Sequence, residues 1–242
     1  MKWTAMHQED GLEHGVWKHL HRVRVGHILD QVEGVKGRLG RRVRILDVGC
    51  GDGVITRRLR ERFPDEALEA LDADPVRLER AQRACPGAVF RDGDATALPY
   101  DAETFDVVLC HHLVEHVADD AAVLRECHRV LTPDGVLLLG IPHEDGAVGR
   151  TLRRLHRKMY AEGEHVNFYT IDQMRRRLAE HGFADIRCAK FGLLVPEYHL
   201  HVLWTWLPLT FRLGHFISQR CDATADSLIF AARKVSLAEA LV

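Results

Sequence analysis

Apolar and polar residues follow two alternating patterns along most of the chain. Short apolar runs, such as Ile45 to Val48 and Phe105 to Cys110, are typical of buried strands. Between such runs, apolar side chains recur at helical spacing, as Val123, Leu124 and Cys127 do. Strands that alternate with amphipathic helices indicate a parallel sheet covered by helices on both faces. The pattern therefore predicts a doubly wound α/β fold.

The same pattern places the individual elements. The expected strands span residues 45–48, 67–71, 88–90, 105–110, 136–141, 184–191 and 227–235. The expected helices span residues 54–63, 76–84, 119–131 and 170–182. The last of these helices is opened by a capping-box sequence at Thr170. Residues 132–135, with the sequence Thr-Pro-Asp-Gly, predict a turn into the fifth strand.

The length of the chain bears on its division into domains. A chain of 242 residues fits one α/β domain with insertions better than two full domains. We expect residues 1–40 to form an N-terminal helical cap and residues 41–242 to form the main domain. Within the main domain, residues 142–169 are expected on the substrate side, and residues 192–217 form an apolar insertion.

Charge and cysteine content narrow the class of protein. The formal net charge of −2 provides no overall attraction to nucleic acid, which disfavours a nucleic-acid substrate. The 6 cysteines are scattered and form no C-x-x-C pair, a pattern that favours reduced thiols over a disulfide framework. The N-terminal segment is mixed in charge and lacks the apolar core of a signal peptide. We therefore expect a cytoplasmic protein.

Two features after the fifth strand allow more than one interpretation. The apolar stretch around Trp204 is too short between its charged neighbours to span a bilayer. Its tryptophans fit either a lid over the substrate cleft or a peripheral contact with a membrane. The basic residues between Arg150 and Lys158 predict a solvated helix face, with contact to a phosphate of the substrate or of a lipid surface as the alternative.

The glycine-rich sequence Gly49-Cys50-Gly51-Asp52-Gly53 predicts a cofactor loop directly after the first strand. Glycines allow a sharp turn and a close approach of the backbone to a ligand. A dinucleotide-binding loop has the form G-x-G-x-x-G, but Val54 occupies the position of its third glycine. The spacing G-x-G-x-G is typical of class I S-adenosylmethionine (SAM) methyltransferases. The loop alone leaves both cofactor classes open.

Polar residues stand at the carboxyl ends of the expected strands, the edge at which ligands of such sheets bind. Asp72 is placed to accept hydrogen bonds from both ribose hydroxyls. Asp94 and the Ala95 amide fit an adenine ring, Asp47 fits a position near the methionine ammonium, and His111 lies beside the sulfonium. The candidate cofactor-binding residues are Asp47, Gly49, Cys50, Gly51, Asp72, Ala73, Asp94, Ala95 and His111.

Six segments carry a resemblance to a known family. They are Ile45–Gly53, Leu71–Pro75, Gly93–Pro99, Phe105–Val108, Leu113–Val117 and Arg129–Gly135, and they stand in the order of that family. In these segments the chain resembles the type 11 group of class I SAM-dependent methyltransferases. The resemblance implies a seven-stranded, mostly parallel sheet with the last strand antiparallel, and SAM as methyl donor. Residues 1–40 and the insertion at 192–217 lie outside the secure match.

The resemblance also implies transfer of the SAM methyl group by in-line displacement, with release of S-adenosylhomocysteine. We expect a small-molecule, lipid-linked or glycan-linked acceptor. O-methylation is favoured because a hydroxyl acceptor needs a base, and an imidazole pKa near 6.5 suits that role. The candidate bases are His112, His143 and His165. The alternatives are N- or C-methylation, an NAD-dependent oxidoreductase, and a noncatalytic SAM-binding partner protein.

A metal site is a further alternative around the end of the fourth strand. A helix starting at His111 would place His112 and His116 on one face, with Glu115 beside them. No third ligand follows from the spacing, so we expect no metal. Instead, Glu115 and His116 are expected to cap and brace the next helix.

Overall fold

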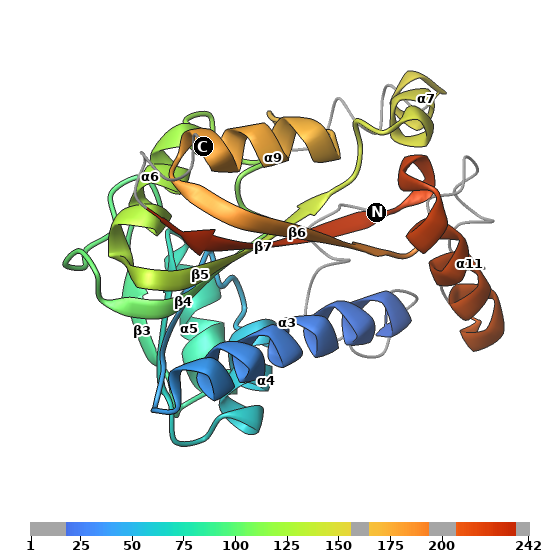
Figure 1. Ribbon diagram of the computed structural model, residues 1–242. Coiled ribbons are helices and arrows are strands. Elements are labelled where there is room, and N and C mark those ends of the chain that lie inside the picture. The colour runs from blue at the N-terminus through green and yellow to red at the C-terminus, as the bar shows by residue number, and fades with distance from the viewer. Residues whose placement is uncertain (1–17, 156–164, 194–206, 236–242) are drawn as a thin grey trace.

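The protein is described by a computed structural model covering residues 18–155, 165–193 and 207–235 (Figure 1). Its centre is a 7-stranded sheet in the order β3-β2-β1-β4-β5-β7-β6. The strands are β1 (Arg44–Val48), β2 (Ala67–Asp72), β3 (Val89–Asp92), β4 (Phe105–His111), β5 (Leu131–Pro142), β6 (Phe183–Phe191) and β7 (Ser227–Lys234). The first five pair in parallel, while β7 runs antiparallel to both β5 and β6. The expected doubly wound fold with an antiparallel last strand is thereby confirmed.

Helices cover both faces of this sheet, with α6 and α9 on one side and α3 and α4 on the other (Figure 1). The described helices are α3 (Lys18–Leu39), α4 (Val54–Arg62), α5 (Pro75–Ala84), α6 (Asp120–Val130), α7 (Ala147–Leu155), α9 (Ile171–Glu180) and α11 (Pro208–Arg220), with the short 3-10 turn η1 (Asp222–Thr224). The four helices expected from the pattern agree with α4, α5, α6 and α9 to within two residues at each end. The pattern does not place α7 or α11.

Local signals fix where these helices begin. The Asp74 side chain caps α5 by accepting from two backbone amides, and Pro75 occupies its first turn. Asp119 caps α6 by accepting from one backbone amide, that of Ala122. At α9, Thr170 and Gln173 form the expected capping box, each side chain bonding to the backbone of the other. Such contacts lie within four residues, which is why the sequence alone locates them.

Alternation of side chains along the strands divides the core into two layers. Leu46 and Val108 point toward α6 and α9 and are buried in one apolar cluster. Their neighbours Ile45 and Leu109 point the other way, into a second cluster with α3, α4 and Phe211 of α11. The N-terminal helix α3 therefore packs into the same core as the sheet.

The expected turn at residues 132–135 is wrong as a strand boundary. β5 already begins at Leu131, which pairs with Phe105, and pairing resumes at Val136 opposite Val107. The intervening residues bulge out of the ladder, with Asp134 at a φ of 60°. The turn residues do bend the chain there, but the pairing of Leu131 with β4 makes the bend an irregularity within the strand.

The register of the parallel strands brings their carboxyl ends to one edge. Val48 pairs with Leu71 on one side and with Cys110 on the other, and Cys110 pairs in turn with Leu139. Residues that directly follow these positions are therefore neighbours, although they lie far apart in the sequence.

Candidate active site

The glycine loop joins β1 to α4 and is held by backbone hydrogen bonds. The amides of Gly49 and Cys50 both donate to the Leu71 oxygen, at 2.8 and 3.0 Å. Gly49 and Gly53 have φ values of 73° and 78°, which side chains rarely adopt. A Cβ at Gly53 would also lie 2.8 Å from the Cβ of Ala81 on α5. Close approach of two backbones therefore requires glycine at Gly53.

Asp72 anchors this loop from the end of β2. Its Oδ2 accepts from the Gly51 amide at 2.7 Å and its Oδ1 accepts from the Asp74 amide at 3.0 Å. The residue is 9% exposed, whereas the following Ala73 is exposed. Because a carboxylate oxygen can accept two hydrogen bonds, Asp72 retains capacity for a ligand hydroxyl.

Asp47 lies buried below the same loop, near the end of β1. Its Oδ2 accepts from the Thr56 hydroxyl at 2.6 Å. Burial raises the pKa of Asp47 to about 7; the Thr56 hydrogen bond opposes this rise and the nearby Asp72 carboxylate adds to it. The pKa of the Cys50 thiol is also raised, mainly by burial and to a lesser extent by the Asp47 and Asp72 carboxylates. Negative potential of this kind favours a cationic group of a ligand at the loop.

Asp94 and Ala95 follow β3 on the far side of β2. Asp94 is exposed, and its Oδ1 accepts from the Thr96 amide at 2.8 Å. That hydrogen bond lowers the pKa of Asp94. Ala95 is buried, and a Cβ on the preceding Gly93 would meet the Leu71 side chain at 2.8 Å. The loop that carries both residues therefore starts beside the end of β2, where the Gly93 amide donates to the Asp72 backbone oxygen at 3.2 Å.

His111 ends β4 and stacks on His112, with 4.5 Å between the ring centroids. Its Nδ1 is buried and has no hydrogen-bond partner among the described residues. Burial, with His112 as a second cause, lowers the pKa of His111 well below the usual value, which makes the ring neutral. A Cβ at Gly140 on β5 would lie 2.3 Å from this nitrogen, so glycine makes room for the ring.

His112 has hydrogen bonds at both ring nitrogens. Nε2 lies 2.9 Å from Nη1 of Arg24, and Nδ1 lies 2.8 Å from Oε1 of Glu115. Because a guanidinium only donates, Nε2 must accept, and Nδ1 carries the proton that is donated to Glu115. Burial raises the pKa of Glu115 to about 7. For His112 to act as a base, Arg24 would first have to release its Nε2.

The helix across His112 and His116 that the metal alternative required does not form, because α6 begins only at Asp120. His112 has a φ of 54°, and its amide donates to the Gly140 oxygen at 2.8 Å. Glu115 and His116 consequently do not cap α6, whose cap is Asp119. Hydrogen bonds to residues distant in the sequence hold this segment in a loop conformation.

The other two candidate bases differ in their surroundings. His143 is 3% exposed, and its Nδ1 lies 3.3 Å from the Ala225 oxygen; burial lowers its pKa. His165 is more accessible, and its Nδ1 lies 2.9 Å from Oε2 of Glu144. Its ring also meets the His116 ring edge-on, 4.7 Å between centroids. The structure therefore brings His165, rather than His143, to the loop that follows β4.

Three polar residues at this edge, Arg24, Thr56 and Glu144, are not among the candidates that the sequence predicts. Arg24 reaches it from α3, donating to His112 and, at 3.3 Å, to the Ser227 hydroxyl. Thr56 lies on α4, and Glu144 follows His143 two residues after β5. Glu144 could have been found by the same strand-end argument, whereas nothing in the sequence around Arg24 points to the site.

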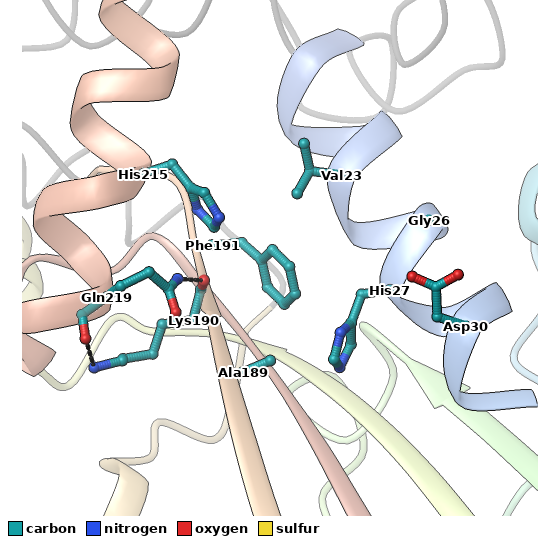
Figure 2. A pocket seen from close by; sticks show the side chains of 9 residues that line it. All are labelled: Val23, Gly26, His27, Asp30, Ala189, Lys190, Phe191, His215 and Gln219. Carbon is teal, nitrogen blue, oxygen red and sulfur yellow. Dashed lines mark hydrogen bonds between the residues drawn. The ribbon is translucent and has the colours of Figure 1, made fainter. Parts of the chain in front are cut away.

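Arg157 and Lys158 of the expected substrate side and Trp204 of the expected apolar insertion lie outside the described residues. Among the described helices, none is long and apolar enough to cross a membrane. A cleft of about 450 Å³ opens between α3, β6 and α11 (Figure 2). Phe191 lies between His27 and His215 there, and none of the candidate site residues lines the cleft.

Comparison with known proteins agrees with this geometry. Residues 46–139 match the family model described as a methyltransferase domain. A ubiquinone biosynthesis O-methyltransferase of Aliivibrio fischeri is 28% identical over 127 residues, which cover 50% of this chain and 52% of that protein. The chain thus spans about half the length of such curated relatives.

Solved structures with the same fold carry different descriptions. A Thermotoga maritima protein, described as a SAM-dependent methyltransferase and possible histamine N-methyltransferase, superposes with a TM-score of 0.62 at 19% identity, covering 96% of this chain and 99% of that one. The [4+2]-cyclase SpnF superposes with a TM-score of 0.59 at 20% identity, covering 86% and 80%. Likeness at this level of identity establishes the fold alone.

The sheet order, the glycine loop and the acidic strand ends define a class I methyltransferase fold. Over residues 46–139 the chain matches the methyltransferase-domain family model, and in this region it is similar to SAM-dependent methyltransferases of the same fold.

Proposed function

We propose that the protein transfers the methyl group of SAM to a hydroxyl oxygen of a small molecule. The observation that carries this proposal is the pair of carboxylates, Asp47 and Asp72, beside the glycine loop. Such a pair attracts the sulfonium and ammonium of SAM and repels the pyrophosphate of NAD. Arg77 is an exposed cation near the loop, and it forms an ion pair with Asp52, with 3.8 Å between Nε and Oδ2.

The names of the relatives support oxygen as the methylated atom. The Aliivibrio fischeri relative is named as an O-methyltransferase of ubiquinone biosynthesis, which favours a hydroxylated small molecule as acceptor. We propose that the acceptor lies between the loop after β4, the described residues 142–155 and 165–169, and the N-terminal helix α3. A nucleic-acid substrate remains disfavoured by the net charge of −2.

The residues of the chain supply binding and proton removal. SAM, when bound, supplies a methyl carbon on a positive sulfur, which becomes the neutral thioether S-adenosylhomocysteine when the acceptor oxygen displaces it. Positioning the two groups can account for about 7 to 11 kcal/mol of the barrier. Among the candidate histidines, His165 is best placed to act on the acceptor hydroxyl, because Arg24 occupies Nε2 of His112 and His143 is buried.

Calorimetry with SAM, S-adenosylhomocysteine and NAD tests the proposal. We expect saturable binding of the first two and none of NAD. Binding of NAD alone would overturn the assignment in favour of an oxidoreductase. Binding of SAM without methyl transfer to any of a panel of phenols, catechols and hydroquinones would favour a noncatalytic SAM-binding protein.

Binding of SAM should depend on pH through Asp47. The carboxyl has a pKa of about 7 in the free protein, so it is mostly protonated at pH 6 and mostly ionised at pH 8. A cationic ligand binds the ionised form more tightly, and affinity should rise about tenfold between these pH values and then level off. Calorimetry of Asp47→Asn provides the control, since its affinity should vary much less. Equal pH profiles in both proteins would contradict this role.

We also propose a peripheral contact of α11 with a membrane that presents a lipid-linked acceptor. Leu209, Leu213 and Phe216 recur on one face of α11 and are 80%, 52% and 53% exposed. Arg212 and Arg220 stand beside them and suit anionic headgroups. In sedimentation with anionic phosphatidylglycerol vesicles, the protein should pellet.

Matched substitutions distinguish this contact from nonspecific adsorption of the protein to vesicles. The double variant Leu209→Ser/Phe216→Ser should remain in the supernatant. Val76→Ser, which removes a similarly exposed apolar side chain (55%) from α5, should pellet like the unmodified protein. Pelleting of all three proteins to the same extent would remove α11 from the contact.

A further inference from the structure

Two segments distant in sequence bring three metal-ligating side chains together. Glu115 and His116 lie in the loop after β4, and His165 lies in the segment that leads to α9. One ligand atom from each falls within 4.8 Å of the others. The spacing of the sequence gives only the first two, which is why a third ligand could not be predicted.

The backbone holds the two segments in place. The backbone amides of Val166 and Asn167 both donate to the backbone carbonyl oxygen of Glu115, at 2.7 and 3.1 Å. The Asn167 side chain donates to the oxygens of Val114 and Val117, at 3.0 and 2.7 Å. The juxtaposition is therefore fixed by four hydrogen bonds that do not involve the ligating side chains.

Glu115 carries a buried oxygen that needs a partner. The residue is 0% exposed, and its Oε1 accepts from Nδ1 of His112. Its Oε2 is buried and accepts no hydrogen bond from the described residues. An unpaired buried carboxylate oxygen is costly, and a cation next to it would offset that cost.

His165 is oriented as metal-binding histidines usually are. Its Nδ1 lies 2.9 Å from Oε2 of Glu144, a contact that places a proton on Nδ1 and the ring lone pair on Nε2. A carboxylate behind a ligating histidine fixes the ring and raises its basicity. His116 stands edge-on to this ring and is exposed, so its side chain is able to adjust.

We propose that Oε2 of Glu115 and the imidazoles of His116 and His165 bind one divalent transition-metal ion, with Zn²⁺ as the best match. Two imidazoles and one carboxylate are a ligand set of zinc sites that keep an open position. Ligand atoms around tetrahedral zinc lie about 3.4 Å apart, so binding would draw His116 inward from the present spacing.

The role of the ion rests on the proposed methyl transfer. The acceptor hydroxyl binds at the open position, and the metal lowers the pKa of that hydroxyl. The O–H bond breaks with the proton passing to water, and the oxygen keeps the electron pair. That pair then forms the bond to the methyl carbon while the C–S electrons pass to sulfur. His165 thus acts on the acceptor through the ion.

Metal content tests the site directly. The full chain is stripped with a chelator, titrated with Zn²⁺ in a calorimeter, and measured by mass spectrometry of bound metal after desalting. We expect His116→Gln and His165→Gln each to bind one Zn²⁺ fewer per chain than the unmodified protein. His181→Gln, which changes a histidine outside the cluster, should bind the same number. Glu144→Gln should retain the ion with about tenfold weaker affinity.

Two results would overturn the inference. One is equal Zn²⁺ content in the unmodified protein and both ligand variants. The other is full methyl transfer by the stripped protein, which would remove the role of the ion while leaving the proposed function intact. Failure of the proposed function is recognised separately, since it would appear as absent SAM binding or absent methyl transfer with Zn²⁺ present.

Discussion

Replacement of Asp72 by alanine should weaken SAM binding about 100-fold, or about 2.7 kcal/mol. In the proposed cofactor site the carboxylate accepts from the ribose hydroxyls, and a hydrogen bond to a charged group contributes about 1.5 to 3 kcal/mol. The same side chain also fixes the loop by accepting from the Gly51 amide at 2.7 Å. Calorimetry with SAM measures the combined loss.

Two variants separate these contributions. Asp72→Asn keeps an oxygen for the Gly51 amide but loses the charge, so its affinity should fall between those of the unmodified and alanine proteins. Asp92→Ala is the matched control, because Asp92 pairs with Asp72 in the sheet register but is exposed. It should bind SAM normally. Unchanged affinity in Asp72→Ala, with unfolding curves that show a folded protein, would remove Asp72 from the cofactor site.

The arrangement of the candidate cofactor residues could be predicted because it depends on strand order and local sequence. Asp47 and Asp72 occur at the ends of apolar runs that are recognisable as strands, and parallel pairing brings such ends together. The glycine spacing requires no tertiary information either. Where geometry follows from one strand and its loop, the sequence contains the whole signal.

The acceptor half could not be predicted in the same way, because distant contacts determine it. Arg24 approaches His112 across 88 residues, and the choice of tautomer at His112 depends on that contact. The loop conformation at Glu115 depends on amides of Val166 and Asn167. A helix is a reasonable local expectation for the sequence after β4, but these hydrogen bonds stabilise a different backbone.

Replacement of Asp120 by alanine should lower the free energy of unfolding by about 3 kcal/mol. Asp120 is 4% exposed at the start of α6 and accepts hydrogen bonds from the Tyr169 hydroxyl and, at 2.7 Å, from Nε of Arg177. Removing a buried charge partner usually costs about 3 to 5 kcal/mol, and partial exposure of Arg177 (33%) places the loss at the lower end. Urea unfolding followed by circular dichroism measures it.

The control for this loss lies on α9, the helix that carries Arg177. Asp172 faces Arg175 at 3.7 Å in an exposed pair on α9, so Asp172→Ala should leave the unfolding midpoint nearly unchanged. Equal losses in the two variants would show that the buried position of Asp120 contributes nothing.

The Asp120 substitution also separates the two halves of the site. Asp120 fixes Tyr169, and through it the segment carrying His165, but it touches neither Asp47 nor Asp72. Under conditions where Asp120→Ala remains folded, methyl transfer should therefore fall while the Kd for SAM stays within about twofold. Parallel loss of both would mean that the segment before α9 also shapes the cofactor site. A loss of methyl transfer without a loss of SAM affinity requires that SAM is held by the strand ends alone. It also requires that the acceptor is held by contacts between α6, α9 and the loop after β4.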